Sequence, residues 1–326
     1  MHRTLTLLVP PPDLARRRST RGRQAVTAEL LALLALISLA LLPLAGCGAK
    51  AGPAATAKAP QGQAERETKL VLVEALRSVR SGDSDDVLSL ATESLLVLGP
   101  RPADAYGSRT DAVLALRELI DARRKPRLSG PGATVLAAPG GRSAYAVERL
   151  QLGRRPLWAT ALLDGHDGIW RIGVLQLSFP VSAGAAKKAG KKLRAPGLAT
   201  PALDKAAGGV KNAAEAEDAL RRALAAPAQL AAALEQADGL AIGTDGALTS
   251  GKRKLAALGK QLAERRYELT SDPMSVVTTD DALAFVACTA NRMTPKGEPA
   301  PVLVGAVFRR TARGWELVVL HEAQAL

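Results

Sequence analysis

The sequence carries the same order of helix and strand patterns twice, once within residues 64–179 and again within residues 213–325. The final strand pattern is the clearest match. Trp170 corresponds to Trp315 and Gln176 corresponds to His321, in both cases 145 positions later. Offsets near 140 and 142 relate the earlier elements, as changes in loop length would produce. The repeat constrains the fold more than any other feature, since one architecture has to suit both copies.

Each copy is expected to open with three helices and to close with antiparallel hairpins. The predicted helices cover residues 65–79, 85–96 and 110–122 in the first copy, and 213–225, 228–237 and 251–265 in the second. Apolar residues repeat in them at helical spacing. Strand patterns joined by short turns follow, beginning at 133–138 and 273–279. Helices followed by a run of hairpins are typical of an α+β fold.

Short segments of the sequence resemble the nuclear-transport-factor-2-like superfamily, especially its SnoaL-like domains. The segments are Gly107-Ser108-Arg109-Thr110-Asp111-Ala112, Ala144-Tyr145-Ala146-Val147, Asp167-Gly168-Ile169-Trp170-Arg171-Ile172 and, in the second copy, Gly314-Trp315-Glu316-Leu317-Val318-Val319-Leu320-His321. The resemblance implies two tandem cone-shaped modules, each with three helices packed on a curved, mainly antiparallel sheet. We expect the modules, 64–180 and 213–326, to fold separately, because each holds a full set of elements.

Seven residues are candidates for lining a pocket or core in these cones: Tyr106, Tyr145, Trp170, Gln176, Phe285, Trp315 and His321. Strict alternation along the closing strands places Trp170 with Gln176, and Trp315 with His321, on one face. Superfamily members that resemble ketosteroid isomerase use a carboxylate base in the cone, and no carboxylate lies on this face. We therefore predict no catalytic residue.

The sequence also indicates no cofactor and no metal site. Two cysteines and three histidines are too few for a zinc site of the common kinds. Of these, Cys288 lies in a predicted strand and is expected to be a small apolar core residue.

The amino terminus has the anatomy of an export signal. Five arginines between Arg16 and Arg23 precede an apolar run at residues 30–44, which is shorter than the ~20 residues that span a bilayer as a helix. The segment Leu44-Ala45-Gly46-Cys47 that follows resembles the bacterial lipobox.

The lipobox resemblance implies that residues 1–46 are a lipoprotein signal peptide and that Cys47 receives acyl chains such as palmitate. Residues 47–63 would then form a flexible tether. We expect the protein in the bacterial cell envelope, lipid-anchored to a membrane and facing the periplasm or the exterior.

The net charge of +13 is unevenly distributed. About +4 lies in residues 1–46 and +6 in residues 181–212, a basic linker rich in Ala, Gly, Lys and Pro. Its four clustered lysines are either simply solvated or contact anionic lipid head groups: Lys187, Lys188, Lys191 and Lys192. No basic face and few aromatic residues are predicted on the modules, which argues against nucleic acid as a partner.

Three functions remain open at the level of sequence. The first is non-catalytic binding of a small apolar ligand in a cone, or of an envelope protein. The second is an isomerase- or hydrolase-like enzyme acting on a small apolar substrate, which a carboxylate buried beside a Tyr or His in one cone would favour. The third is a structural assembly factor of the envelope, with its sheet faces buried against each other or against a partner.

Overall fold

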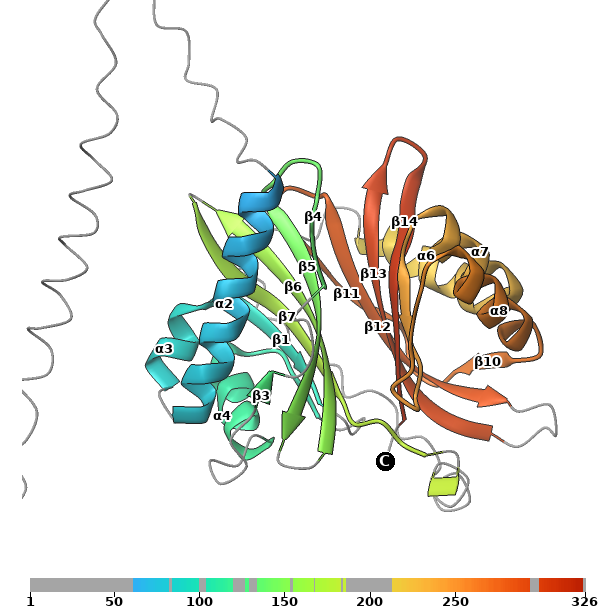
Figure 1. Cartoon of the computed structure of the whole chain (residues 1–326), viewed down its shortest axis with the longest axis horizontal. Helices are drawn as coiled ribbons and strands as arrows, with labels where there is room; N and C mark the ends of the chain where they lie inside the picture. Colours follow the sequence, from blue (N-terminus) through green and yellow to red (C-terminus); the bar gives the residue numbers. More distant parts are fainter. Residues whose placement is uncertain are drawn as a thin grey trace, which may run out of the picture. The chain divides into compact units, whose positions relative to one another are not determined.

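The first copy forms a seven-stranded sheet with three helices on one of its faces (Figure 1). The strands follow the order β2-β1-β7-β6-β5-β3, with β4 paired to β5. The helices are α2 (Gln61–Ser81), α3 (Ser84–Ser89) and α4 (Arg109–Leu119). The strands are β1 (Ala91–Leu98), β2 (Ala105–Tyr106), β3 (Arg127–Leu128), β4 (Thr134–Ala137), β5 (Ser143–Leu152), β6 (Arg155–His166) and β7 (Ile169–Ser178).

The second copy repeats this topology strand for strand. Its order is β10-β12-β13-β14-β8-β9, with β11 paired to β12, so each strand has a counterpart in the first sheet. The helices are α6 (Ala213–Ala225), α7 (Pro227–Gln236) and α8 (Lys252–Ala263). The strands are β8 (Leu240–Ile242), β9 (Leu248–Ser250), β10 (Arg266–Leu269), β11 (Met274–Val277), β12 (Leu283–Met293), β13 (Pro299–Thr311) and β14 (Gly314–Gln324). The predicted α+β class with two tandem modules is confirmed.

The structure is a computed structural model that describes residues 61–81, 84–99, 104–119, 127–128, 134–152, 155–166, 168–182, 184–185, 213–293 and 299–324. All of these residues belong to one compact unit, Ala57–Leu326. The predicted signal peptide with Cys47, the four clustered lysines and most of the predicted linker lie outside the described residues. At the start of that linker, Val181 is buried and its N–H donates to the Thr244 carbonyl at 2.8 Å.

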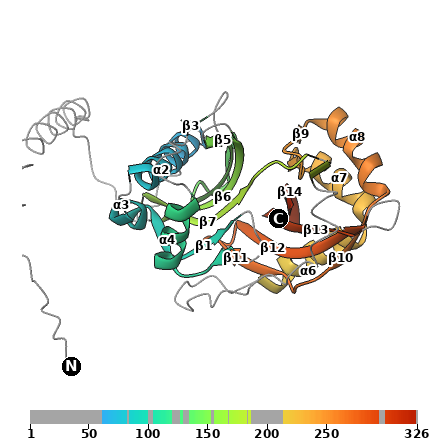
Figure 2. The same ribbon diagram turned by 90° about the horizontal axis from the view of Figure 1, so that it is seen from below.

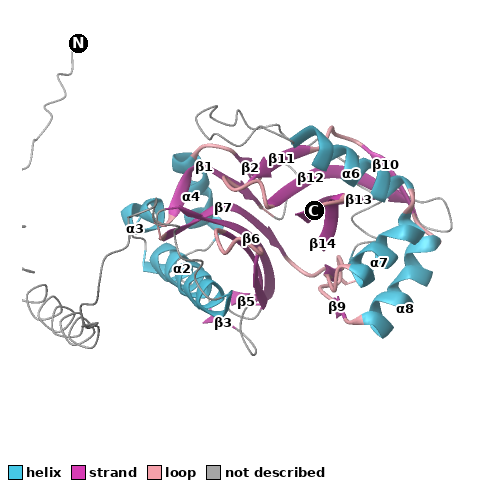
Figure 3. Cartoon of the chain, turned by 90° about the horizontal axis from the view of Figure 1, so that it is seen from above, coloured by secondary structure: helices cyan, strands magenta, loops and turns pink. Residues whose placement is uncertain are grey.

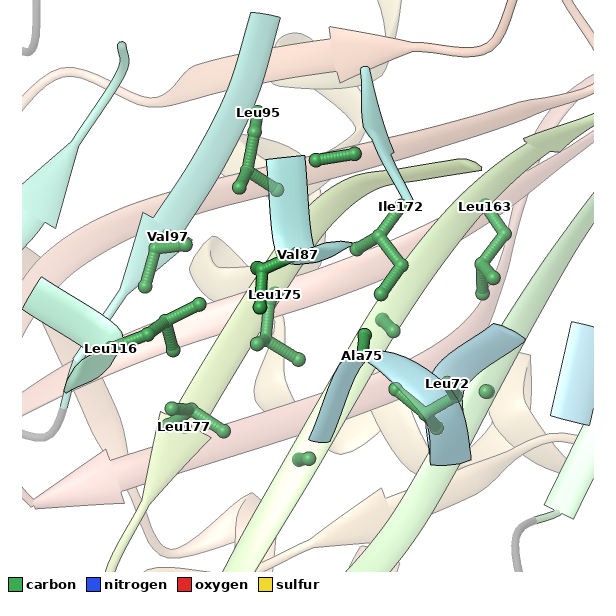
Figure 4. Close-up of a cluster of buried hydrophobic side chains, with 14 of the residues drawn as sticks. Leu72, Ala75, Val87, Leu95, Val97, Leu116, Leu163, Ile172, Leu175 and Leu177 are labelled. Atoms are coloured by element: carbon green, nitrogen blue, oxygen red, sulfur yellow. The ribbon is translucent and has the colours of Figure 1, made fainter. Parts of the chain in front are cut away.

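Each sheet has its own helix-side core. In the first module, Leu72 of α2, Val87 of α3 and Leu116 of α4 pack onto Ile172 and Leu175 of β7 (Figure 4). In the second, helices α6, α7 and α8 cover one face of the sheet (Figures 2 and 3) and bury residues such as Leu220, Leu234 and Leu255. Ser108 caps the start of helix α4, since the Asp111 N–H donates to Ser108 Oγ at 3.1 Å, and Ser108 Oγ donates to the Asp111 carboxylate at 2.7 Å.

The predicted helix over 85–96 is wrong in its second half. Helix α3 ends at Ser89, and β1 then pairs in parallel with β7 (Val97 opposite Leu175). Leu95 and Val97 face the helix-side core, whereas Leu96 and Leu98 face the other side of the sheet. The helical spacing of Val87, Leu88, Ala91 and Leu95 predicts one continuous helix. The end of β1 is buried on both faces and therefore lacks the polar alternation that would indicate a strand.

A β-bulge in each closing strand also overturns the predicted facing of the side chains. In β7 the extra residue is Gly173, because Leu162 pairs with Val174 while Leu163 pairs with Ile172. In β14 it is Val318, which is 145 positions later. One extra residue shifts the alternation by one, so Trp170 faces the helices while Gln176 faces the opposite side. Trp315 likewise packs on the helix side, away from His321.

Candidate functional site

The faces of the two sheets that carry no helices share a single hydrophobic cluster. Its members from the first module include Leu98, Tyr145, Val147, Trp158 and Val174. From the second module they include Phe285, Leu303, Val307, Val319 and Ala323. The two modules therefore bury these faces against each other, and this contact does not test the expectation that each module folds as a separate unit. The physical reason for the burial is that both closing strands are apolar on both faces, so each module alone would expose a wide apolar surface.

A buried polar contact lies within this interface. The ring of His321, on β14, is fully buried between two hydroxyl groups of the first module. Its Nδ1 lies 2.8 Å from Thr160 Oγ1 on β6, and its Nε2 lies 2.6 Å from Ser178 Oγ at the end of β7. Burial lowers the pKa of His321 to about 3, so the imidazole is neutral and one ring nitrogen accepts while the other donates.

Gln176 occupies the corresponding position in the first module. It is also fully buried, and its Nε2 donates to the His321 carbonyl at 3.3 Å. Its side chain lies over Gly305 of β13, where a Cβ atom would come within 1.8 Å of Gln176 Oε1. The absence of a side chain at Gly305 is therefore a condition for this packing.

Further hydrogen bonds join the modules around this pair. Trp158 Nε1 donates to the Gly246 carbonyl at 3.0 Å, and Ser143 Oγ donates to Asp280 Oδ2 at 3.0 Å. The Thr279 N–H donates to Asp164 Oδ2 at 2.8 Å. The Ser178–His321 contact has the partners of a nucleophile and a base, but the residues are 4% and 0% exposed, and no substrate could reach them without separation of the sheets.

The cone of the second module holds a buried carboxylate beside a tyrosine. Glu322, 3% exposed, faces the helix side and accepts a hydrogen bond from the Tyr267 hydroxyl. Arg292 Nη1 lies 2.8 Å from Glu322 Oε2, and Arg265 Nη1 lies 3.5 Å from it. Burial and the Glu322 charge both raise the pKa of Tyr267. Because both carboxylate oxygens are engaged and two guanidinium groups compensate the charge, the cluster is suited to structure rather than to proton abstraction.

Among the described residues of the first module, side chains of the helices and of the sheet pack into the cone. A cavity of about 20 Å³ remains, lined by apolar residues only: Leu72, Ala75, Val87, Ala91, Leu95, Leu116, Ile172 and Leu175 (Figure 4). Ligand sites are typically ~300–1,000 Å³, so this cavity is far too small for a substrate. On the same face, Glu148 is 2% exposed, and its Oε1 has no hydrogen-bond partner. Burial raises the pKa of Glu148, against the opposing effect of Lys69.

The seven candidate residues fall into two groups. Tyr145, Gln176, Phe285 and His321 lie between the sheets, where burial raises the pKa of Tyr145 to about 12. Tyr106, Trp170 and Trp315 lie on the helix sides, and Trp170 Nε1 donates to Glu67 Oε2 at 3.0 Å. Cys288 is buried on the helix side of its sheet, and its pKa is raised to about 12 by burial.

The candidates predicted from the sequence do not include Thr160, Ser178 and Gly305, which complete the interface. They also do not include Tyr267 and Glu322 of the second cone. The repeat contains a signal for Thr160, Ser178 and Gly305. Gly305 lies 145 positions after Thr160, and Ala323 lies 145 positions after Ser178. The pairs differ in polarity at the same offset that relates Gln176 to His321.

The described part of the chain holds neither a group of side chains suited to a metal ion nor a helix suited to cross a membrane. No group of three or more His, Cys, Asp or Glu side chains there is placed to hold a metal ion. Among the same residues, no helix is both long and apolar enough to cross a membrane.

No protein-family model matches the sequence, and no curated protein matches it. Solved structures similar to it include a nuclear-transport-factor-2-like protein of unknown function from Pseudomonas putida, with 17% identity over 37% of this chain and 90% of that one, at a TM-score of 0.32. Another nuclear-transport-factor-2-like protein of unknown function, from Silicibacter pomeroyi, has 13% identity over 36% of this chain and 97% of that one, at a TM-score of 0.31. A cystatin-like-fold protein of unknown function from Nostoc punctiforme has 12% identity over 36% of this chain and 91% of that one, also at a TM-score of 0.31.

Protonation of His321 should destabilise the interface in acid. The pKa is near 6.5 in the unfolded chain and about 3 in the fold, so between these values the unfolded state binds the extra proton. The free energy of unfolding should then fall by about 1.4 kcal/mol per pH unit as the pH decreases. His321→Asn lacks this titration, and denaturant unfolding of both proteins from pH 7 to 4 isolates it. A difference between the two that is constant with pH would contradict the buried, neutral imidazole.

Two buried glutamates should respond in opposite ways to the same substitution. Glu322→Gln leaves Arg292 and Arg265 without a compensating charge and should lower the free energy of unfolding by about 3–5 kcal/mol. For Glu148 the folded pKa is raised, so its ionisation opposes folding increasingly as the pH rises above the unfolded value. Glu148→Gln should therefore be more stable than the parent protein at pH 8, by urea unfolding, and lose this advantage near pH 4. Equal effects of the two substitutions would contradict these environments.

Proposed function

We propose that this chain is a bacterial envelope lipoprotein, anchored through Cys47, whose paired modules act non-catalytically as a rigid unit that binds partner proteins. The observation that supports the non-catalytic role is the burial of the two sheet faces against each other, together with the small size of the cavity in the first cone. The sheet faces are buried against each other around His321, and the first cone retains a cavity of only about 20 Å³.

The anchor is supported by the sequence of the leader. A basic segment, an apolar run of about 15 residues and Leu44-Ala45-Gly46-Cys47 occur in the order that lipoprotein export requires. Several acyl chains on one cysteine suit stable anchoring, because a single chain binds membranes only marginally. The described modules would then be held at the membrane surface by the segment that precedes α2.

Burial of the sheet faces favours a protein partner over a small ligand. With the sheet faces covered, the surfaces left to a partner are the solvent-exposed sides of the helices and the sheet edges. The lysines of the linker, Lys187, Lys188, Lys191 and Lys192, would add contacts with anionic lipid head groups and bring the unit closer to the membrane.

An enzyme acting in the second cone is the second candidate. It is favoured by Glu322, which is the buried carboxylate beside a tyrosine that such chemistry would need. To act as a base, Glu322 would have to exchange its contacts with Arg292 and Arg265 for contacts with a substrate. This is the weaker proposal, because both carboxylate oxygens of Glu322 already accept hydrogen bonds, from Tyr267 and Arg292.

The two cysteines give a matched test of the anchor. Cys47→Ser should move the protein from the detergent phase to the aqueous phase in Triton X-114 partitioning and abolish labelling by radioactive palmitate. Cys288→Ser, at the buried cysteine of β12, should leave both unchanged. Retention of the Cys47→Ser protein in the detergent phase would refute lipidation at this residue.

Closure of the first cone can be tested with a small apolar probe. Benzene should give no saturable binding to the parent protein in calorimetric or NMR titrations, because the cavity is too small for it. Leu72→Ala is the positive control, since removing this lining side chain should leave a dry apolar cavity of the kind that binds benzene. Saturable binding to the parent protein would show an open pocket and count against the non-catalytic proposal.

A further inference from the structure

We propose that the sheet face of each module is built to pair with the unlike module and rejects a second copy of itself. Three pairs of equivalent positions, all 145 residues apart, carry the difference: Thr160 and Gly305, Gln176 and His321, and Ser178 and Ala323. The register confirms the equivalence, because Thr160 lies opposite Gln176 in the first sheet and Gly305 lies opposite His321 in the second.

The observed interface between the two modules has two halves. One half is obtained from the other by exchanging each residue for the one at the equivalent position of the other module. In one half, His321 of the second module lies against Thr160 of the first. In the other, Gln176 of the first module lies over Gly305 of the second. The two halves differ in what each side chain receives, and Gln176 Oε1 has no hydrogen-bond partner in its half. His321 receives two hydroxyl partners, Thr160 and Ser178, whereas Gln176 receives the space that a glycine leaves.

Pairing of two first modules in the same geometry would place Gln176 over Thr160 in both halves. A Cβ atom at that place comes within 1.8 Å of Gln176 Oε1, and threonine adds two further heavy atoms. To relieve this contact, the end of the Gln176 side chain would have to move inside an interface where both residues are fully buried.

Pairing of two second modules would fail for the opposite reason. His321 would lie over Gly305 and near Ala323, so both ring nitrogens would lose their hydroxyl partners while remaining buried. A buried polar group without a partner opposes association, and here there would be two such groups on each ring. A steric conflict therefore disfavours the pairing of two first modules, and unpaired buried polar groups disfavour the pairing of two second modules.

This complementarity has a consequence for the assembled protein. The two faces are closed to other copies of the chain unless unlike modules are exchanged between chains. A partner protein then has to be recognised outside the interface. This inference does not depend on the lipid anchor or on the absence of catalysis.

The test exchanges residues without changing the amino-acid composition of the chain. In the two-residue exchange, Gln176→His with His321→Gln, each side chain faces the wrong partner. In the six-residue exchange, Thr160→Gly, Ser178→Ala, Gly305→Thr and Ala323→Ser are added, so the complementary halves are restored in reversed positions. Both variants keep contacts away from these positions, such as Trp158 with Gly246, which cancel in the comparison. Only the six-residue exchange places a Cβ atom at position 305, where Phe285 Cζ of the same module lies 2.9 Å away, so its recovery is expected to be incomplete.

Thermal unfolding of the full chain without its signal peptide is the measurement. Two unpaired ring nitrogens and one steric conflict should lower the Tm of the two-residue exchange by about 5–15 °C. The six-residue exchange should recover at least half of this loss. A two-residue variant that does not fold, beside a six-residue variant that does, supports the proposal equally. A two-residue exchange within about 2 °C of the parent protein would overturn it, and so would a six-residue exchange that is no more stable than the two-residue one.

Discussion

Burial of two apolar sheet faces against each other is the constraint on which the rest of the structure depends. Each module has already used one face of its sheet to bury its helices, as Leu72 and Leu116 do in the first. The opposite face carries Leu98, Val147 and Val174 in one module and Phe285, Val307 and Val319 in the other. Water would be the only neighbour of these side chains if the modules separated, so the association is driven by the same hydrophobic effect that forms each core.

The polar residues within this apolar interface define its geometry. Apolar packing alone tolerates shifts of one sheet over the other, whereas hydrogen bonds to both nitrogens of His321 fix one relative position. The bulges at Gly173 and Val318 make this possible, because they turn Gln176 and His321 towards the interface while Trp170 and Trp315 stay on the helix sides. The same bulge turns Glu322 into the second cone, where Arg292 and Tyr267 engage it.

The sequence predicted the architecture well and the site poorly, and both outcomes have physical reasons. Helix α6 and the hairpins follow clear periodic patterns, and the constant offset of 145 between Trp170 and Trp315 indicated one topology for both halves. The end of β1, residues 95–98, is buried on both faces and shows no alternation, so the sequence does not indicate a strand there. A single extra residue such as Val318 leaves no mark in the composition, yet it reverses the facing of every residue after it. The contact of Thr160 with His321 joins residues from different modules, and no local pattern reports such a pair.

The two modules share one buried interface, and we therefore expect them to unfold together. Differential scanning calorimetry of the chain without its signal peptide tests this most directly, at neutral pH, where His321 is uncharged. We expect a single transition in which the calorimetric enthalpy equals the van't Hoff enthalpy. Two resolved transitions, each with the enthalpy of one module, would contradict it and would mean that the contacts around His321 contribute little to the stability of the protein.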